Sequence, residues 1–274
     1  MDDLKAAFTS QHHGFKQKVL ALLRSDDFTE SLGELNKFSD RKVINSLFSF
    51  FSCPEQTIKW RAVSVLGALV AKRAEKNIEA GREIVRRLMW SLNNESGSCG
   101  WSAPEAMGEI MACHEGLAKE YAPMLRSYIS KTGNYLDHPL LQHGVLWGLG
   151  RLAQWRPDLV QDALKDLSVF LVSHDALLRG LAVWTLGFLN CTLYQVAFKS
   201  RSRRRQGIDA GVHLSTSRCM TRSQQRYTNE GDLVLIQKLI ETLLNDHTEI
   251  GLYVNQKIMS VSISDLTQQA LARL

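Results

Sequence analysis

Charged side chains that could take part in chemistry occur at helical spacing near the middle of the chain. Two carboxylates, Glu105 and Glu109, stand four residues apart. On one helix they would face the same side, where each could raise the pKa of the other, serve acid–base chemistry or bind a divalent metal. Only His143 stands out as a third ligand, so the pattern predicts no metal site and no cofactor.

Aromatic and charged residues of the same spacing recur before and after this pair. Eight of them form one row that could line a binding groove: Trp60, Trp101, Glu105, Glu109, His143, Trp147, Arg151 and Trp184. Tryptophan and arginine are typical of binding surfaces, whereas lysine and glutamate dominate surfaces that bind no partner. The alternative is structural: the tryptophans fill gaps between helices, and Glu105, Glu109 and Arg151 form ion pairs.

Four segments of similar sequence must position this row. Each has a glycine at the same place, and the glycines Gly67, Gly108, Gly150 and Gly187 are 41, 42 and 37 residues apart. Apolar residues lie five before, one before and two after each glycine, which is the spacing of one face of an α-helix. Because glycine in mid-helix costs about 1 kcal/mol relative to alanine, its recurrence indicates close approach of a neighbouring helix.

Further helices are expected between these segments. Leucine and isoleucine at helical intervals predict helices over residues 84–92, 121–129, 160–171 and 235–244. The chain is therefore expected to be an all-α repeat of helix pairs with a period near forty residues.

The last thirty residues depart from this helical pattern. Residues 248–254 alternate apolar and polar side chains, and a second short run follows the turn residues Asn255 and Gln256, which predicts a β-hairpin. Ser264 and Asp265 then begin a last helix. A hairpin and a helix at this position would seal the open end of a helical array.

The helix pairs resemble HEAT-like repeats of the phycobilisome-lyase type. The resemblance rests on Arg61-Ala62-Val63 with Leu66-Gly67 and on Arg179 with Ala182-Val183 and Leu186-Gly187, and it covers residues 40–190 best. It implies a right-handed α–α superhelix of about five to six pairs, in which the second helices line a concave groove. The family includes scaffolds, lyases, hydroxylases and DNA glycosylases, so the resemblance implies a fold more than a function.

One enzymatic alternative remains open. HEAT-like alkylpurine DNA glycosylases place tryptophan, an acidic residue, arginine and tryptophan on the concave face, and Trp101, Glu105, Arg151 and Trp184 are similar, with glutamate in place of aspartate. Stacking of the indoles on a displaced base and support of a developing oxocarbenium by the carboxylate would be the chemistry.

Positive charge is concentrated between Lys199 and Arg226, where eight basic residues accompany one acid. We expect a flexible basic insertion at 199–230, between HEAT-like repeats at 1–198 and a last helical repeat with the hairpin and helix cap at 231–274. Its arginines could capture nucleic acid or another anionic partner, and a solvated loop without a partner is the alternative. The candidate anion-binding residues are Arg201, Arg203, Arg204 and Arg205.

The sequence thus favours a non-enzymatic scaffold that binds a protein or peptide in the concave groove. P-loop, dinucleotide-binding and nucleophile-elbow motifs are absent from the sequence. The acidic start, the lack of long apolar runs and five scattered cysteines predict a cytoplasmic protein without a membrane segment.

Overall fold

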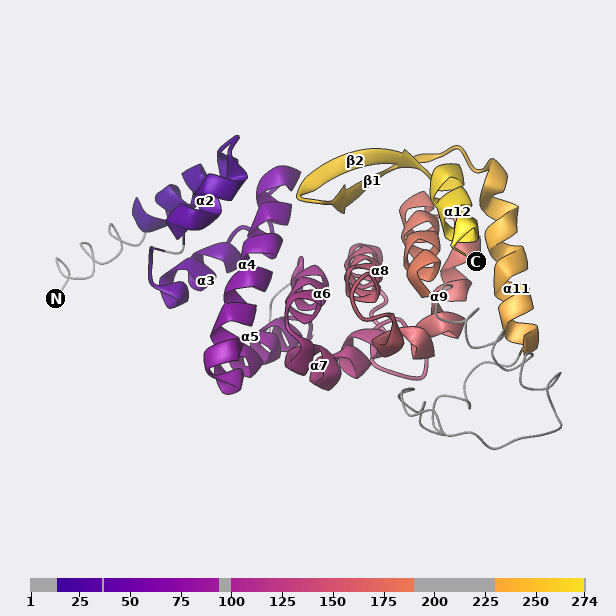
Figure 1. Cartoon of the computed structure of the whole chain (residues 1–274), viewed down its shortest axis with the longest axis horizontal. Helices are drawn as coiled ribbons and strands as arrows, with labels where there is room; N and C mark the ends of the chain where they lie inside the picture. Colours follow the sequence, from indigo (N-terminus) through magenta and orange to yellow (C-terminus); the bar gives the residue numbers. More distant parts are fainter. Residues whose placement is uncertain (1–13, 36, 94–99, 190–229, 274) are drawn as a thin grey trace, which may run out of the picture.

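Helices stacked in two layers form most of the molecule (Figure 1). The computed structural model describes residues 14–35, 37–93, 100–189 and 230–273. The inner layer contains α4 (Gln56–Lys76), α6 (Ala103–Cys113), α8 (Pro139–Ala153) and a helix over 176–189. The outer layer contains α5 (Ile78–Ser91), α7 (Glu115–Ser127) and the short helix α9 (Leu164–Val169). Short 3-10 helices flank α9: η2 (Pro157–Leu159), η3 (Gln161–Ala163) and η4 (Phe170–Val172).

Shorter elements lie at both ends of this stack. A helix over 14–24, α2 (Phe28–Leu35) and α3 (Asp40–Phe48) precede α4. At the other end, α11 (Glu230–Glu241) and η5 (Thr242–Asn245) lead into β1 (Glu249–Val254), β2 (Lys257–Ser262) and α12 (Ile263–Ala272). The predicted all-α solenoid with a C-terminal hairpin and helix is confirmed. The basic residues Arg201, Arg203, Arg204 and Arg205 lie outside the described residues.

The apolar stripe of the inner helices forms the core, as its spacing predicts. The position five before each glycine is fully buried in all four segments: Ala62, Ala103, Val145 and Ala182 are at most 1% exposed. The central helix α6 packs on α4 at one side and on α8 at the other. All of its residues except Cys113 are therefore buried, including both glutamates.

Each recurring glycine lies in close contact with a neighbouring helix, and at Gly108 the contact is with bare backbone. A Cβ atom placed at Gly108 would lie 2.3 Å from the Cα atom of Gly148 and 2.6 Å from its carbonyl oxygen. No side chain fits at that crossing, so α6 and α8 approach each other through bare backbone.

Polar side chains define where several helices begin. The Nδ1 atom of His114 accepts a hydrogen bond from the Leu117 amide at the start of α7, and His138 accepts one from Leu140 at the start of α8. Pro139 follows His138 in the first turn of α8, where its missing N–H costs little. His138 and Pro139 thus fix where α8 begins, and α8 carries three of the predicted groove residues.

The hairpin was predicted to seal the open end of the helical array together with the last helix, but it lies over the inner helices instead. Its strands pair antiparallel with Val254 opposite Lys257, and the turn residues Asn255 and Gln256 have φ values of 51° and 63°, as a type I′ turn requires. At the end of the stack, α12 packs against η5 and α11. The hairpin instead extends back over the inner helices as far as α4 (Figure 1). It therefore covers the inner layer, and α11, η5 and α12 form the end of the stack.

Candidate functional site

The hairpin divides the concave side of the solenoid into two pockets. We call the surface of α4, α6, α8 and the 176–189 helix that faces β1 the inner wall. One pocket, of about 390 Å³, lies between the N-terminal halves of these helices and Gly251 of β1. The other, of about 290 Å³, is lined by later residues of α4, α6 and α8, by α2 and by the hairpin turn. We name them the Trp101 pocket and the Arg151 pocket.

Tyr253 fixes the hairpin to the inner wall. Its ring stacks on the indole of Trp60 at a centroid distance of 4.9 Å and an interplanar angle of 9°. Its hydroxyl shares a 3.0 Å hydrogen bond with Ser64 Oγ, and its carbonyl oxygen accepts a 3.0 Å hydrogen bond from Trp147 Nε1. Trp147 is consequently only 3% exposed. Two predicted groove tryptophans therefore already bind a segment of the same chain.

The Trp101 pocket combines aromatic rings with paired charges. Lys59 Nζ lies 3.3 Å from Glu105 Oε1, and His143 Nε2 lies 2.7 Å from Asp175 Oδ2. Burial alone would raise the pKa of Asp175, but hydrogen bonds from His143 and from the Leu178 and Leu177 amides outweigh it and lower that pKa. The rings of Trp60 and Trp101 are half-buried, so part of each remains open to a ligand.

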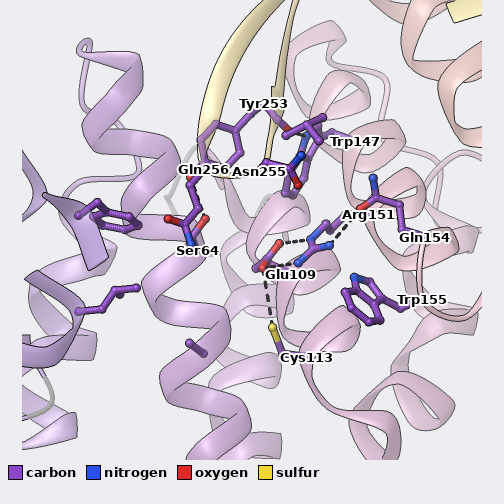
Figure 2. Close-up of a pocket in the computed structure, with 14 residues that line it drawn as sticks. Ser64, Glu109, Cys113, Trp147, Arg151, Gln154, Trp155, Tyr253, Asn255 and Gln256 are labelled. Carbon is purple, nitrogen blue, oxygen red and sulfur yellow. Dashed lines mark hydrogen bonds and ion pairs between the residues drawn. The ribbon is translucent and has the colours of Figure 1, made fainter. Parts of the chain in front are cut away.

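The Arg151 pocket is built around a second ion pair (Figure 2). Arg151 donates from Nε to Glu109 Oε2 at 2.6 Å and from Nη2 to Glu109 Oε1 at 3.1 Å. Its Nη1 atom donates to Gln154 at 3.0 Å. Burial lowers the pKa of Arg151, but the Glu109 carboxylate outweighs this and raises it, so the guanidinium is charged at any ordinary pH. Trp155, 65% exposed, forms the open side of the pocket.

Cys113 lies beside this pair with its Sγ atom 3.7 Å from Glu109 Oε1. Desolvation and then the negative charge of Glu109 raise the pKa of the thiol from 9.0 to about 12. Only the thiolate is nucleophilic, and at pH 8 this pKa leaves a small thiolate fraction.

We therefore expect iodoacetamide at pH 8 to alkylate Cys113 about a hundredfold more slowly than it alkylates glutathione. Site-resolved mass spectrometry of the quenched reaction measures this rate. The same protein in guanidinium chloride is the control, in which Cys113 should react as an ordinary cysteine. A rate in the folded protein equal to that of glutathione would contradict the placement of the thiol against Glu109.

The structure brings most of the predicted groove residues together, but around two pockets. Trp60, Trp101, Glu105 and His143 line the Trp101 pocket, and Glu109 and Arg151 line the other. Trp147 separates the two and lines both. Trp184 lines neither; it is 7% exposed and packs edge-on against Phe188 at 5.7 Å.

The glycosylase-like quartet is divided by this arrangement. Trp101 and Glu105 lie in one pocket and Arg151 in the other, and Trp184 is a packing residue. Glu105 pairs with Lys59 and Glu109 with Arg151, as the structural alternative for these side chains predicts.

Sequence reasoning missed the contribution of the hairpin. Tyr253 contacts residues nearly two hundred positions earlier, and no local pattern indicates such a contact. Trp155 is different: it lies two residues beyond the end of α8, with its ring centroid 5.9 Å from Arg151 Cζ, and its closeness to Arg151 in sequence could have identified it. Lys59 and Asp175, which pair with predicted residues, were also missed.

The described residues contain no group of three or more histidine, cysteine, aspartate or glutamate side chains placed to hold a metal ion. Of the helices in this part of the chain, none has the length and apolar character needed to cross a bilayer.

Comparison with known proteins concerns the repeat itself. Residues 139–189, which include α8 and the 176–189 helix, match the family model of the HEAT-like repeat. The crystal structure of an engineered protein is similar, with 12% sequence identity, a TM-score of 0.45, and coverage of 94% of this chain and 95% of that one. No curated protein matches the sequence. Residues 139–189 therefore contain a HEAT-like repeat, within a chain of stacked helix pairs.

Proposed function

We propose that this protein is a non-enzymatic scaffold that binds a peptide segment of a partner protein in the Trp101 pocket. The observation that carries the proposal is the convergence of five predicted groove residues, four of them aromatic or imidazole rings, on one pocket of about 390 Å³. Half-buried aromatic rings in a concave surface are the usual anchors of protein interfaces.

The pairing of the charges supports binding rather than catalysis. Among the predicted groove residues, Glu105, Glu109 and His143 have side chains able to supply acid–base chemistry. Each glutamate is held in an ion pair, and His143 is hydrogen-bonded to Asp175. A side chain held this way can orient a ligand through its remaining hydrogen-bonding capacity. The paired charges surround the rings of the Trp101 pocket, so a partner residue with a large apolar side chain fits there best.

Substitution of Trp101 tests the proposal. Trp101→Ala removes one exposed ring face, and loss of an interface anchor costs about 2 kcal/mol, or roughly a thirtyfold loss of affinity. Affinity purification from the native cell with quantitative mass spectrometry should therefore show the partners of the wild-type protein lost from this variant. Circular dichroism and the melting curve verify that the variant folds.

Trp90→Ala is the matched control. Trp90 lies on the outer helix α5, is 57% exposed and lines neither pocket of the inner wall. This variant should retain the same partners as the wild type. Retention of every partner by a folded Trp101→Ala variant would overturn the proposed function.

A further inference from the structure

One edge of the hairpin presents unpaired backbone to the Trp101 pocket. In a hairpin with a two-residue turn, the residues that flank the turn exchange backbone hydrogen bonds, and the bonding then alternates along the strands. Here Val254 pairs with Lys257 next to the turn, so Gly251 and Ser260 form a non-hydrogen-bonded pair. The N–H and C=O of Gly251 therefore point away from β2, toward the outer edge of β1.

The Tyr253 carbonyl shows which way this edge faces. Tyr253 occupies the same kind of position in the ladder as Gly251, two residues away. Its carbonyl oxygen accepts the hydrogen bond from Trp147 Nε1, a side chain of the inner wall. The outer edge of β1 thus faces the inner wall, and Gly251 lines the Trp101 pocket directly.

Nothing in the described part of the chain uses the outward groups of Gly251. No hydrogen bond from a described residue reaches them beyond the hairpin ladder. The position is exposed, and a Cβ atom there would meet only Ile258 Cγ2, at 3.7 Å. The outward N–H and C=O of Gly251 thus make no hydrogen bond within the described residues, and Gly251 borders the pocket that Trp60 and Trp101 also line.

We propose that the peptide segment binds in an extended conformation, as an additional strand alongside β1 at Gly251. This inference rests on the proposed function and specifies its partner: an extended segment whose backbone pairs with Gly251 and whose large apolar side chain contacts Trp101. An added strand lies about 4.8 Å from its neighbour, and backbone pairing with an exposed edge is a recurrent mode of peptide recognition.

The charges of the pocket specify the partner further. Lys59 forms an ion pair with Glu105, and His143 is hydrogen-bonded to Asp175, so these polar side chains around the strand edge have partners within the chain. The segment recognised here is therefore uncharged at the residues that enter the pocket, and the backbone supplies its polar contacts.

Gly251→Pro tests the pairing because proline removes one outward N–H. Proline is tolerated in an edge strand where its nitrogen faces away from the neighbouring strand, so the ladder with β2 is kept. Two matched controls are available. Gly251→Ala keeps the N–H and has room for its methyl group. Ser260→Pro removes the equivalent N–H from the opposite edge, which does not line the pocket.

The probe is a peptide selected from a random-peptide phage library on the immobilised full-length protein, and its affinity is measured by fluorescence polarisation. We expect Gly251→Pro to weaken binding about tenfold, which corresponds to about 1.4 kcal/mol. Gly251→Ala and Ser260→Pro should leave it within about twofold. N-methylation of the peptide, residue by residue, should weaken binding to the wild-type protein at alternate positions.

The outcomes separate this inference from the proposed function. A peptide that depends on Trp101 but is unaffected by Gly251→Pro and by N-methylation at every position overturns strand addition and leaves the groove as the binding site. Failure to select any peptide that depends on Trp101 overturns both. Because N-methylation is tested on the unaltered protein, the result stands even if Gly251→Pro distorts the hairpin.

Discussion

Gly108→Ala is expected to lower the free energy of unfolding by about 3 kcal/mol, at the upper end of the cost of overpacking a core. The new methyl carbon would lie 2.3 Å from Gly148 Cα. A Cβ atom and a Cα atom are both fixed by the backbone, so no change of side-chain rotamer can relieve the clash. Relief requires that α6 and α8 separate by roughly 1 Å or more. Since α6 also packs against α4, the displacement spreads to a second interface.

The measurement is the thermal and urea unfolding of the purified protein, with an expected fall in Tm of roughly 6–12 °C. Gly33→Ala in α2 is the matched control, because a Cβ atom there meets nothing within 4 Å. That variant should be as stable as the wild type or more stable by up to about 1 kcal/mol. Equal stability of Gly108→Ala and the wild type would mean that the two inner helices are not in backbone contact.

The crossing of α6 and α8 at Gly108 could be predicted because the sequence repeats. The glycine at the centre of each segment and the apolar residues around it are local signals, and four copies make them visible without any structure. The buried stripe and the close approach of neighbouring helices could therefore be predicted, residue by residue. The same periodicity placed Trp60, Trp101, Glu105, His143 and Trp147 on a common surface.

The position of the hairpin could not be predicted because it depends on contacts distant in sequence. Alternation of side chains indicates that residues 249–262 form two strands, but the pattern is the same wherever the hairpin lies. What brings it to the inner wall is the stack of Tyr253 on Trp60 and the hydrogen bond from Trp147. Those tryptophans were predicted to bind a partner; in the structure they first bind the hairpin, and the site for a partner is what the hairpin leaves open.

Arg151→Ala is expected to lower the free energy of unfolding by about 3 kcal/mol. Removal of one member of a buried pair leaves the other charge without compensation, and this costs more than the pair contributes as a whole. The side chain of Glu109 is only 9% exposed, and it would lose both hydrogen bonds from the guanidinium. Arg151 itself is 24% exposed, which places the effect at the lower end of the range for buried pairs.

A double substitution distinguishes this charge effect from lost packing. In Glu109→Gln combined with Arg151→Met no charge is left unpaired and the volume of both side chains is nearly kept, so most of the stability lost in Arg151→Ala should return. Arg24→Ala breaks the exposed pair with Glu55, whose side chains are 56% and 46% exposed, and should change the free energy of unfolding by no more than about 0.5 kcal/mol. Urea unfolding of the three variants measures these differences. If the double variant is as unstable as Arg151→Ala, the guanidinium acts through its packing between Gln154 and Trp155, and the charge of Glu109 is not what destabilises the fold.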